Sequence, residues 1–310
     1  MTTTDMTTDV ITVMDQAQEL RNLVMKSREE KKENPEKYIK NARVIAVTSG
    51  KGGVGKTNFT INLAIALSRH GKRVSIVDAD FGLANIEVLC GIIPKHTLGD
   101  VLLGKKTMEE VLSDGPEGIK FISGGSGITE LANISANQTQ YVLQNLEFLD
   151  EVSDIVLIDT GAGISKSVVS LISAAAEVII ISTPEPTSLT DAYSIIKTIK
   201  ESDGSDPNFK IVVNRVESVK EGDEIFEKLS MVSQKFLSLS IEKLGIIPHD
   251  AQLIKAVKNQ KPLLINSPNS DAARAINNIC SKLLELPVEE KKTGGGFMGF
   301  LKRLTSGEGV

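Results

Sequence analysis

The chain has 310 residues, of which 41% are hydrophobic and 24% charged, with a formal net charge of −5. This composition is ordinary for a soluble globular protein, and the length suits one large α/β domain. No apolar run reaches the roughly 18–20 residues that span a bilayer, and the polar start MTTTDMTTDV does not resemble a secretory signal. The acidic balance gives no overall attraction to nucleic acid or anionic lipid, so such binding would need a local patch.

The two cysteines, Cys90 and Cys280, lie far apart and form no CxxC. This usage favours a reducing cytoplasmic compartment and argues against a disulfide framework or an iron–sulfur scaffold. We expect both to be buried as small hydrophobic residues.

Residues 1–42 form a polar leader with one periodic stretch. Its apolar residues Val13, Ala17, Leu20 and Val24 recur at the spacing of a single helix face. The charged run KSREEKKENPEK follows, with an Asn-Pro break, and predicts a flexible or loosely helical linker. Because the leader can bury little surface alone, we expect it to be ordered only when docked on a partner.

From Arg43 onward, short apolar β-rich runs alternate with helical segments. The expected strands are RVIAVTS, RVSIVDAD, SDIVLIDT, EVIIIST, FKIVVNR and EKLGIIP. Helical periodicity predicts helices that include 56–71, 138–151, 187–201 and 269–286. This alternation predicts a doubly wound, mostly parallel sheet with helices on both faces, and no change of composition divides residues 43–287.

Beyond residue 287 the chain continues into a glycine-rich linker, 288–296, and a short apolar and basic segment, 297–310. In FMGFLKRL the apolar side chains fall at i, i+3, i+4 and i+7, backed by Lys302 and Arg303. An apolar face backed by cations is typical of an interfacial membrane helix, although such a tail could also pack on the domain. The predicted membrane-contacting residues are Phe297, Met298, Phe300, Leu301 and Leu304.

The segment GKGGVGKT, residues 50–57, satisfies the phosphate-binding pattern G-x-x-x-x-G-K-[ST] between a predicted strand and a predicted helix. Its glycines let backbone amides curl around phosphates at a helix N-terminus. Lys56 would reach the β- and γ-phosphates, and the Thr57 hydroxyl would bind Mg²⁺. The predicted nucleotide-contacting residues are Gly50, Lys51, Gly52, Gly53, Val54, Gly55, Lys56, Thr57 and Asn58.

The additional lysine of this loop, Lys51, resembles the signature of the deviant Walker A family, which includes MinD, ParA, the nitrogenase iron protein and ArsA. The resemblance implies ATP or ADP with Mg²⁺ as cofactors, and a homodimer in which Lys51 reaches the partner's nucleotide. Such a charge supplied in trans acts like an arginine finger in phosphoryl transfer. The family resemblance also implies that the two monomers of the dimer enclose two ATP molecules.

Further matches extend this resemblance over nearly all of 43–287. VDAD resembles the family's switch I acidic pair, Asp78 and Asp80, whose second aspartate orients the attacking water. The simpler interpretation is that both aspartates cap a loop end. DIVLIDTGAG resembles Walker B and switch II, which implies that Asp159 holds Mg²⁺ through water and that Gly161 and Gly163 let the loop sense the γ-phosphate. The implied catalytic residues are Lys51, Lys56 and Asp80, and the implied metal residues are Thr57, Asp80 and Asp159.

The segments VVNRV and IPHD resemble the family's adenine-side segments. There Asn214 would bond the base edge, and Pro248 and Asp250 would flank the base. The predicted residues on this side are Asn214, Arg215, Pro248, His249 and Asp250.

The terminal segments discriminate among the branches of the family. Iron carriers have paired cysteines, the tyrosine-kinase branch has a tyrosine-rich tail, and ArsA-type pumps usually have a duplicated domain. This sequence has none of these features, so the ParA-type and MinD-type ATPases remain. The leader sequence DQAQELRNL resembles the D-Q-A-x-x-L-R motif of the FlhG family, also called YlxH or FleN, which are MinD-like regulators of flagellar number and placement. In that family the leader activates FlhF, a GTPase of the signal-recognition-particle type. The matching residues are Asp15, Gln16, Ala17, Leu20 and Arg21.

The sequence thus predicts a slow, Mg²⁺-dependent ATPase switch that dimerises on ATP and attaches reversibly to the inner face of the cell membrane, near a pole or a flagellar basal body. Its expected partners are an FlhF-type GTPase and lipid, with flagellar switch-ring proteins as further candidates and no specific nucleic acid. Three alternatives stay open: a MinD-like division-site regulator, a ParA-like DNA-partitioning ATPase that needs a basic patch, and a metabolic ATP-dependent ligase, which would need neither Lys51 nor the terminal segments.

Overall fold

The computed structural model describes residues 42–80, 85–125, 145–201 and 207–286. Within them lie eight strands: β1 (Arg43–Thr48), β2 (Val74–Ala79), β3 (Leu112–Asp114), β4 (Lys120–Ile122), β5 (Ile155–Thr160), β6 (Glu177–Ser182), β7 (Asn208–Val216) and β8 (Glu242–Pro248). The helices are α2 (Lys56–Arg69), α3 (Ile86–Cys90), α4 (Leu98–Leu102), η2 (Pro116–Gly118), α6 (Leu149–Val152), α7 (Lys166–Ser173), α8 (Pro186–Glu201), α9 (Val219–Leu237), α10 (Ala251–Lys258), α11 (Leu263–Asn266) and α12 (Asp271–Leu283).

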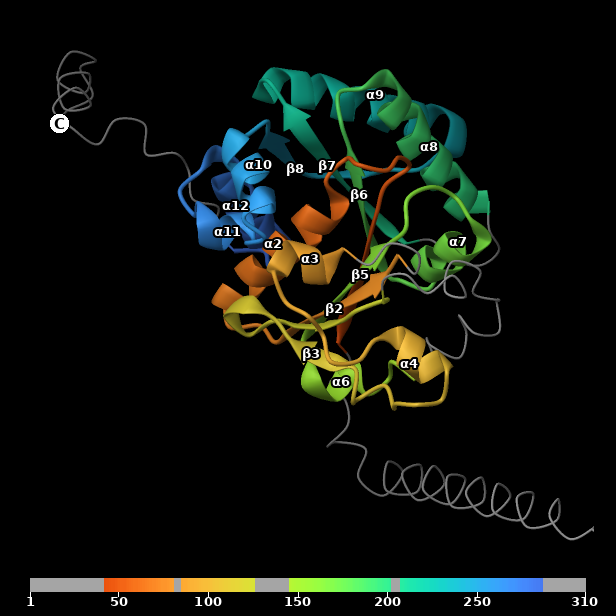
Figure 1. Cartoon of the computed structure of the whole chain (residues 1–310). Helices are drawn as coiled ribbons and strands as arrows, with labels where there is room; N and C mark the ends of the chain where they lie inside the picture. Colours follow the sequence, from red (N-terminus) through yellow and green to blue (C-terminus); the bar gives the residue numbers. More distant parts are fainter. Residues whose placement is uncertain (1–41, 81–84, 126–144, 202–206, 287–310) are drawn as a thin grey trace, which may run out of the picture. The chain divides into compact units, whose positions relative to one another are not determined.

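The strands form one sheet in the order β3-β4-β2-β5-β1-β6-β7-β8 (Figure 1). Every neighbouring pair is parallel except β3 and β4 at one edge. Strand β1 lies between β5 and β6, so the chain winds outward from it in both directions. In such sheets ligands bind outside the carboxyl ends of the strands where the winding reverses, which here is the end of β1.

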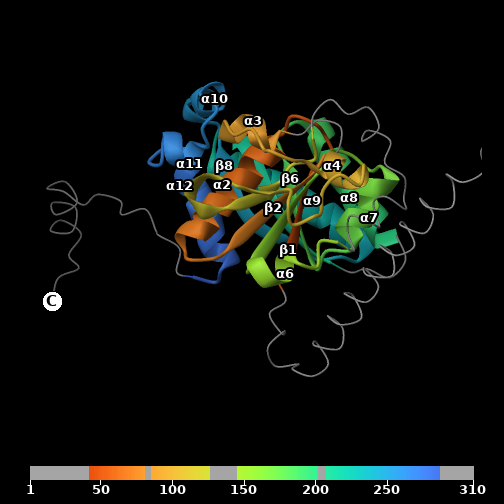
Figure 2. The same ribbon diagram turned by 60° about the horizontal axis from the view of Figure 1, so that its bottom comes forward.

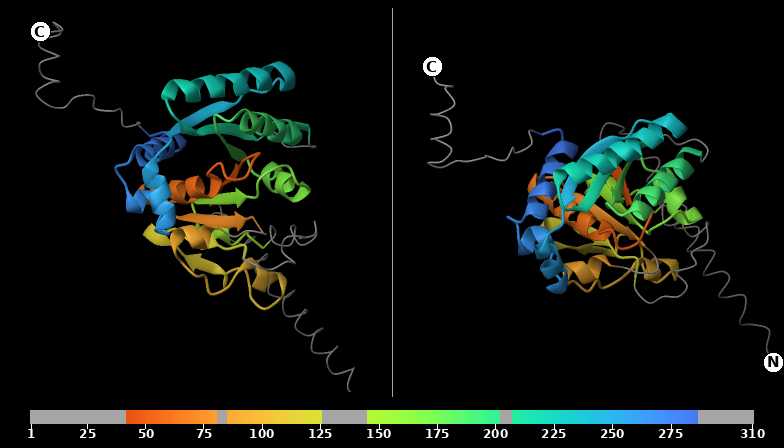
Figure 3. Two further views of the ribbon diagram at one scale, coloured as in Figure 1. Left: turned by 45° about the horizontal axis from the view of Figure 1, so that its top comes forward. Right: turned by 90° about the horizontal axis from the view of Figure 1, so that it is seen from above.

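Helices cover both faces of this sheet, as the turned views in Figures 2 and 3 show. One hydrophobic cluster joins the sheet to α2, α3, α11 and α12, and a second joins it to α7, α8 and α9. The inner strands are continuous apolar runs because both of their faces are buried. The predicted doubly wound, mostly parallel fold is confirmed.

One predicted helix is confirmed only at its end. Of the segment 138–151, residues 138–144 lie outside the described residues, and residues 145–148 form a turn before the short α6. Backbone bonds from Leu149 to Leu146 and from Asp150 to Glu147 span three residues rather than four. The chain turns tightly here because it enters β5 at Ile155 soon afterwards.

The amino ends of the parallel strands carry a row of alternating charges. Arg43 forms a two-pronged ion pair with Glu177, at 2.5 and 2.7 Å. Lys210 follows, 2.7 Å from Glu242, and Lys282 of α12 lies 3.5 Å from the same glutamate. Each of these charges has a partner of opposite sign from a neighbouring strand or helix.

Candidate nucleotide-binding site

The glycine-rich segment 50–57 forms the loop between β1 and α2. Gly53 and Gly55 have left-handed backbone angles, with φ of 78° and 96°, which residues with a Cβ rarely adopt. At Gly55 the space is also limiting, because a Cβ would lie 2.6 Å from Asn214 Nδ2. A glycine loop of this kind, opening directly into a helix, is a site for phosphate groups.

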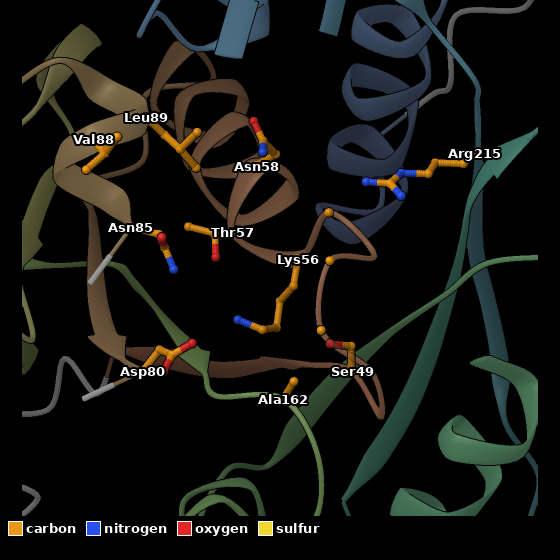
Figure 4. A pocket seen from close by; sticks show the side chains of 13 residues that line it. Ser49, Lys56, Thr57, Asn58, Asp80, Asn85, Val88, Leu89, Ala162 and Arg215 are labelled. Carbon is orange, nitrogen blue, oxygen red and sulfur yellow. The ribbon is translucent and has the colours of Figure 1, made fainter. Parts of the chain in front are cut away.

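Beside the loop lies a cavity of about 340 Å³, within the range of small-molecule sites. Asp80 and Asn85 lie on one side of Lys56 and Thr57, and Arg215 lies on the other (Figure 4). The lining residues are Ser49, Gly52, Gly53, Gly55, Lys56, Thr57, Asn58, Asp80, Asn85, Val88, Leu89, Ala162 and Arg215. The structure thus brings most of the predicted phosphate-side residues to one cavity.

Lys56 and Asp159 form a buried ion pair below this cavity. Lys56 Nζ lies 2.9 Å from Asp159 Oδ1, and the Thr60 hydroxyl donates to the same oxygen at 3.1 Å. Lys56 is only 7% exposed and Asp159 is fully buried. Lys56 thus lines the cavity while its ammonium group is paired with Asp159.

The donor set fits a magnesium ion bound together with phosphate. The second carboxylate oxygen of Asp159, Oδ2, is buried and has no hydrogen-bond partner within the described ranges. A buried acceptor of this kind can hold a metal-bound water, and the Thr57 hydroxyl can bind the ion directly. No group of three or more acidic, histidine or cysteine side chains in the described parts could hold a metal by itself. Magnesium would therefore depend on oxygens that the nucleotide supplies.

The two aspartates of VDAD have different positions. Asp78 is buried at the end of β2, where its carboxylate accepts the backbone N–H groups of Asp80 and Asn85, both at 3.1 Å. Burial and the nearby charge of Asp159 raise the pKa of Asp78 to about 8. Asp78 therefore holds the two ends of the intervening loop, while Asp80 lines the cavity.

The loop after β5 is fastened to the phosphate loop. Gly163 has φ of 93°, and its N–H donates to the Ser49 carbonyl at 3.0 Å. A Cβ placed on Gly161 would lie 3.8 Å from Asp80 Oδ1, so this loop also approaches the switch I side. The loop after β5 therefore lies next to both the phosphate loop and Asp80, and its response to the γ-phosphate stays a prediction.

Lys51 points away from the cavity of its own chain. Its Nζ lies 2.5 Å from Glu185 Oε2 and 3.4 Å from the Thr187 hydroxyl at the start of α8. The pair lowers the pKa of Glu185. Gly50 permits the close approach, because a Cβ there would lie 2.4 Å from Asp191 of the same helix. Lys51 is also absent from the residues that line the cavity.

The predicted adenine side is only partly in the cavity. Arg215, with φ of 62°, lines it, whereas Asn214 is buried behind the loop and donates from Nδ2 to the Val54 carbonyl at 2.7 Å. Asp250 caps α10 through the Gln252 N–H and also accepts from Ala272. Pro248 and His249 lie at the junction of β8 and α10, and neither lines the cavity. Base binding by these residues stays a prediction.

The sequence did not indicate several of the site residues. Thr60 lies one helical turn after Lys56, so its spacing could have indicated that both face Asp159. Glu185 follows β6, whose carboxyl end lies beside that of β1. Asn85, Val88 and Leu89 gave no signal, because α3 is too short for periodicity. The predicted leader motif and membrane segment, residues 15–21 and 297–304, lie outside the described residues.

The chain matches a family profile named ParA, described as NUBPL iron-transfer P-loop NTPase, over residues 40–284. The antiactivator FleN of Pseudomonas aeruginosa is 40% identical over 252 residues, which cover 81% of this chain and 90% of FleN. The flagellum site-determining protein YlxH of Helicobacter pylori is 34% identical over 283 residues, covering 87% and 93% of the two chains.

Among solved structures, the septum site-determining protein MinD of Pyrococcus horikoshii in complex with Mg-ADP aligns with a TM-score of 0.66 at 25% identity. The alignment covers 78% of this chain and 96% of that MinD. The resemblance to deviant Walker A ATPases and to FlhG-type proteins is thereby confirmed. The chain belongs to the ParA and MinD family of P-loop ATPases and is related to the flagellar proteins FleN and YlxH over most of its length.

Proposed function

We propose that this protein is an ATP-driven switch of the FlhG type, which regulates the number or placement of flagella from the membrane surface. Its relatives FleN, an antiactivator, and YlxH, a flagellum site-determining protein, support the cellular role. The motif DQAQELRNL ahead of this particular phosphate loop supports a partner GTPase of the FlhF type.

The observation that carries the ATP-dependent step is the position of Lys51. Its ammonium group pairs with Glu185 outside the cavity formed by its own chain, which supports a role toward a second nucleotide rather than the nucleotide of its own chain. We infer that two chains enclose two Mg²⁺-ATP molecules, with Lys56 and Thr57 acting on the nucleotide of their own chain. Lys51 of each would neutralise charge that develops on the other nucleotide.

The chain's own residues assign the remaining roles. Lys56, now paired with Asp159, would bind phosphate oxygens of the nucleotide. Asp159 would help to hold Mg²⁺ through Oδ2, which has no hydrogen-bond partner among the described residues. The carboxylate of Asp80 orients the attacking water. The loop after β5, hydrogen-bonded to Ser49, passes the loss of the γ-phosphate to the dimer interface.

Two other functions have less support. Iron transfer, which the description of the matching family profile mentions, would need exposed or paired thiols. Here burial raises the pKa values of Cys90 and Cys280 to about 12. A MinD-like role in division would share the ATPase cycle but would leave the leader motif without a purpose.

The leader provides the decisive experiment. The full-length chain with ATP should stimulate GTP hydrolysis by the cognate signal-recognition-type GTPase, and Gln16→Ala should abolish most of that stimulation. The control is the ATPase rate of the variant, which should equal the wild-type rate because residue 16 lies outside the ATPase domain. Absence of stimulation by the wild-type chain would reject the FlhF-type partner.

The tail provides the second experiment. Deleting residues 297–310 should abolish ATP-dependent binding to phospholipid vesicles, because a dimer joins two weak membrane helices into one stronger attachment. Dimerisation on ATP, measured by light scattering, should persist in the truncated chain. Retained vesicle binding would show that the attachment has another source.

A further inference from the structure

A basic and apolar surface lies on α10 and the adjoining loop after α3. Lys95, Lys255, Lys258 and Lys261 are all exposed, and none makes an ion pair with another residue of the described ranges. The two segments that carry them, GIIPKHT and AQLIKAVKNQK, contain no acidic residue. This concentration of cations stands out in a chain whose net charge is −5.

The two segments are in contact. A Cβ added to Gly91 would lie 2.8 Å from the Gln260 carbonyl, just after the end of α10. Figure 2 also shows α10 next to α3. Three aliphatic side chains are exposed on the same segments: Ile93 at 95%, Ile254 at 51% and Val257 at 39%. These seven residues are called the α10 patch below.

The opposite side of α10 anchors it to the domain. Ala256 is buried, and Leu253 packs on the core cluster shared with α2 and α12. The patch is therefore a fixed surface of the domain. Its exposed side chains combine positive charge with hydrocarbon.

The combination of lysines and exposed aliphatic side chains indicates which kind of partner surface the α10 patch can bind. Four lysines with no ion-pair partner in the described parts of the chain call for an anionic partner, and burial of the three aliphatic side chains among them is favourable only against a non-aqueous phase. A nucleic-acid backbone would pair the lysines but would leave the aliphatic groups against a charged, hydrated surface. The headgroup layer of an anionic bilayer satisfies both.

The position of the patch is compatible with the predicted tail. Helix α12 begins next to α10, since Asp250 accepts the N–H of Ala272, and its 13 residues extend about 20 Å. Residues 287–296 can span up to about 33 Å when extended. The tail can thus enter the same membrane surface that the patch would face.

We propose that the α10 patch is a second membrane contact, which lies on anionic phospholipid headgroups while the tail inserts. This proposal rests on the membrane attachment put forward above. The tail supplies insertion, and the patch supplies selectivity for anionic lipid and a fixed orientation of the domain on the bilayer.

The test uses the full-length chain with ATP and Mg²⁺, and vesicles of phosphatidylcholine alone or mixed equally with phosphatidylglycerol. The triple variant Lys255→Gln, Lys258→Gln, Lys261→Gln should bind the mixed vesicles about a hundredfold more weakly, because each lysine near an anionic surface is worth about fivefold in affinity. Binding to phosphatidylcholine alone should not change. The double variant Ile254→Ser, Val257→Ser should weaken binding to both kinds of vesicle.

The matched control removes the same charge from exposed lysines elsewhere, in Lys72→Gln, Lys228→Gln, Lys235→Gln. Equal losses in the two triple variants would indicate a general charge effect and overturn the proposal. Unchanged vesicle binding by the α10 triple variant would overturn it as well. If that variant instead loses only affinity for duplex DNA, the patch binds nucleic acid.

The outcomes also separate this proposal from the membrane function itself. A wild-type chain that binds neither kind of vesicle would reject both membrane proposals. Wild-type binding that disappears on deletion of residues 297–310, but is unaffected by the α10 triple variant, would reject the patch alone.

Discussion

Buried lysines occur at both ends of the central strands, and their surroundings differ. At the amino end, Lys210 is 8% exposed and lies between Glu242 and Glu177, the latter already paired with Arg43. At the carboxyl end, Lys56 is 7% exposed and has Asp159 as its ion-pair partner, while one oxygen of that carboxylate has no hydrogen bond among the described residues. The amino-end charges satisfy one another, whereas the carboxyl-end charges retain unused hydrogen-bonding capacity.

This difference explains why two similarly buried lysines have different roles, Lys210 in stability and Lys56 in ligand binding. The network of alternating charges at the amino end links neighbouring strands through ion pairs. The carboxyl end also has loops of glycine with left-handed backbone angles, which leave space beside the charges. Polar groups that are buried but incompletely bonded are costly unless a ligand completes them. We therefore expect a bound ligand to stabilise the carboxyl end, because it can complete the hydrogen bonding of these buried groups.

The largest expected effect on ATP hydrolysis comes from substituting the two buried lysines in separate variants. Lys56→Gln should lower ATP hydrolysis about a thousandfold, because it removes the charge aimed at the transferring phosphate. Lys210→Gln should leave hydrolysis within about twofold and lower the free energy of unfolding by about 1 kcal/mol, since its glutamate partners are partly exposed. Steady-state phosphate release and urea unfolding would measure both. Equal hydrolysis in the two variants would remove the distinction between the two ends.

A smaller effect should separate binding from chemistry within the carboxyl end. Asp80→Ala should lower hydrolysis about a hundredfold while ATP affinity changes little, because Asp80 acts on water rather than on the phosphates. The variant should accumulate as an ATP dimer on vesicles. Asp191→Ala is a suitable control, since this residue packs near Gly50 and does not line the cavity. Normal hydrolysis by Asp80→Ala would show that its assigned role is wrong.

The sequence predicted the central strands well because a strand buried on both faces reads as a continuous apolar run. Strands β1, β2, β5, β6, β7 and β8 were all expected near their observed bounds. Strands β3 and β4 were missed because each has only three residues, too few for a period to appear. Helix α3 was missed for the same reason, although it forms one wall of the cavity.

The site shows the same division. The phosphate loop, Asp80 and Asp159 follow from local motifs, so their convergence on one cavity region was predictable. The hydrogen-bond partner of Asn214 and the ion-pair partner of Lys51 lie far away in the sequence, so no local pattern predicts them. The Asn214 amide bonds the Val54 carbonyl across 160 positions of sequence, and Lys51 meets Glu185 across 134. Such pairs become visible only when the carboxyl ends of β1, β6 and β7 are placed side by side.

A further difference between the two ends concerns pH, and the sign of the pH effect on stability should be opposite at the two ends. The folded protein raises the pKa of Asp78 from 3.8 to about 8 through burial, so between these values the unfolded chain is ionised while the folded chain holds a proton. The contribution of Asp78 to stability therefore falls as pH rises, by at most about 1.4 kcal/mol per pH unit. Hydrogen bonding to Arg43 instead lowers the pKa of Glu177 below 4.5. Its contribution is present above that pH and is lost as pH falls.

Urea unfolding of Asp78→Asn and Glu177→Gln over a pH series should resolve the two signs. Relative to the wild type, Asp78→Asn should gain stability progressively from about pH 5 to pH 8, because the asparagine has no charge to suppress. Glu177→Gln should be destabilised at neutral pH and approach the wild type at acidic pH, where the glutamate is protonated. A constant difference between Asp78→Asn and the wild type across this range would mean that Asp78 is already ionised in the folded protein. The carboxyl end would then hold two buried negative charges beside a single lysine, and a bound cation would be needed there even more strongly.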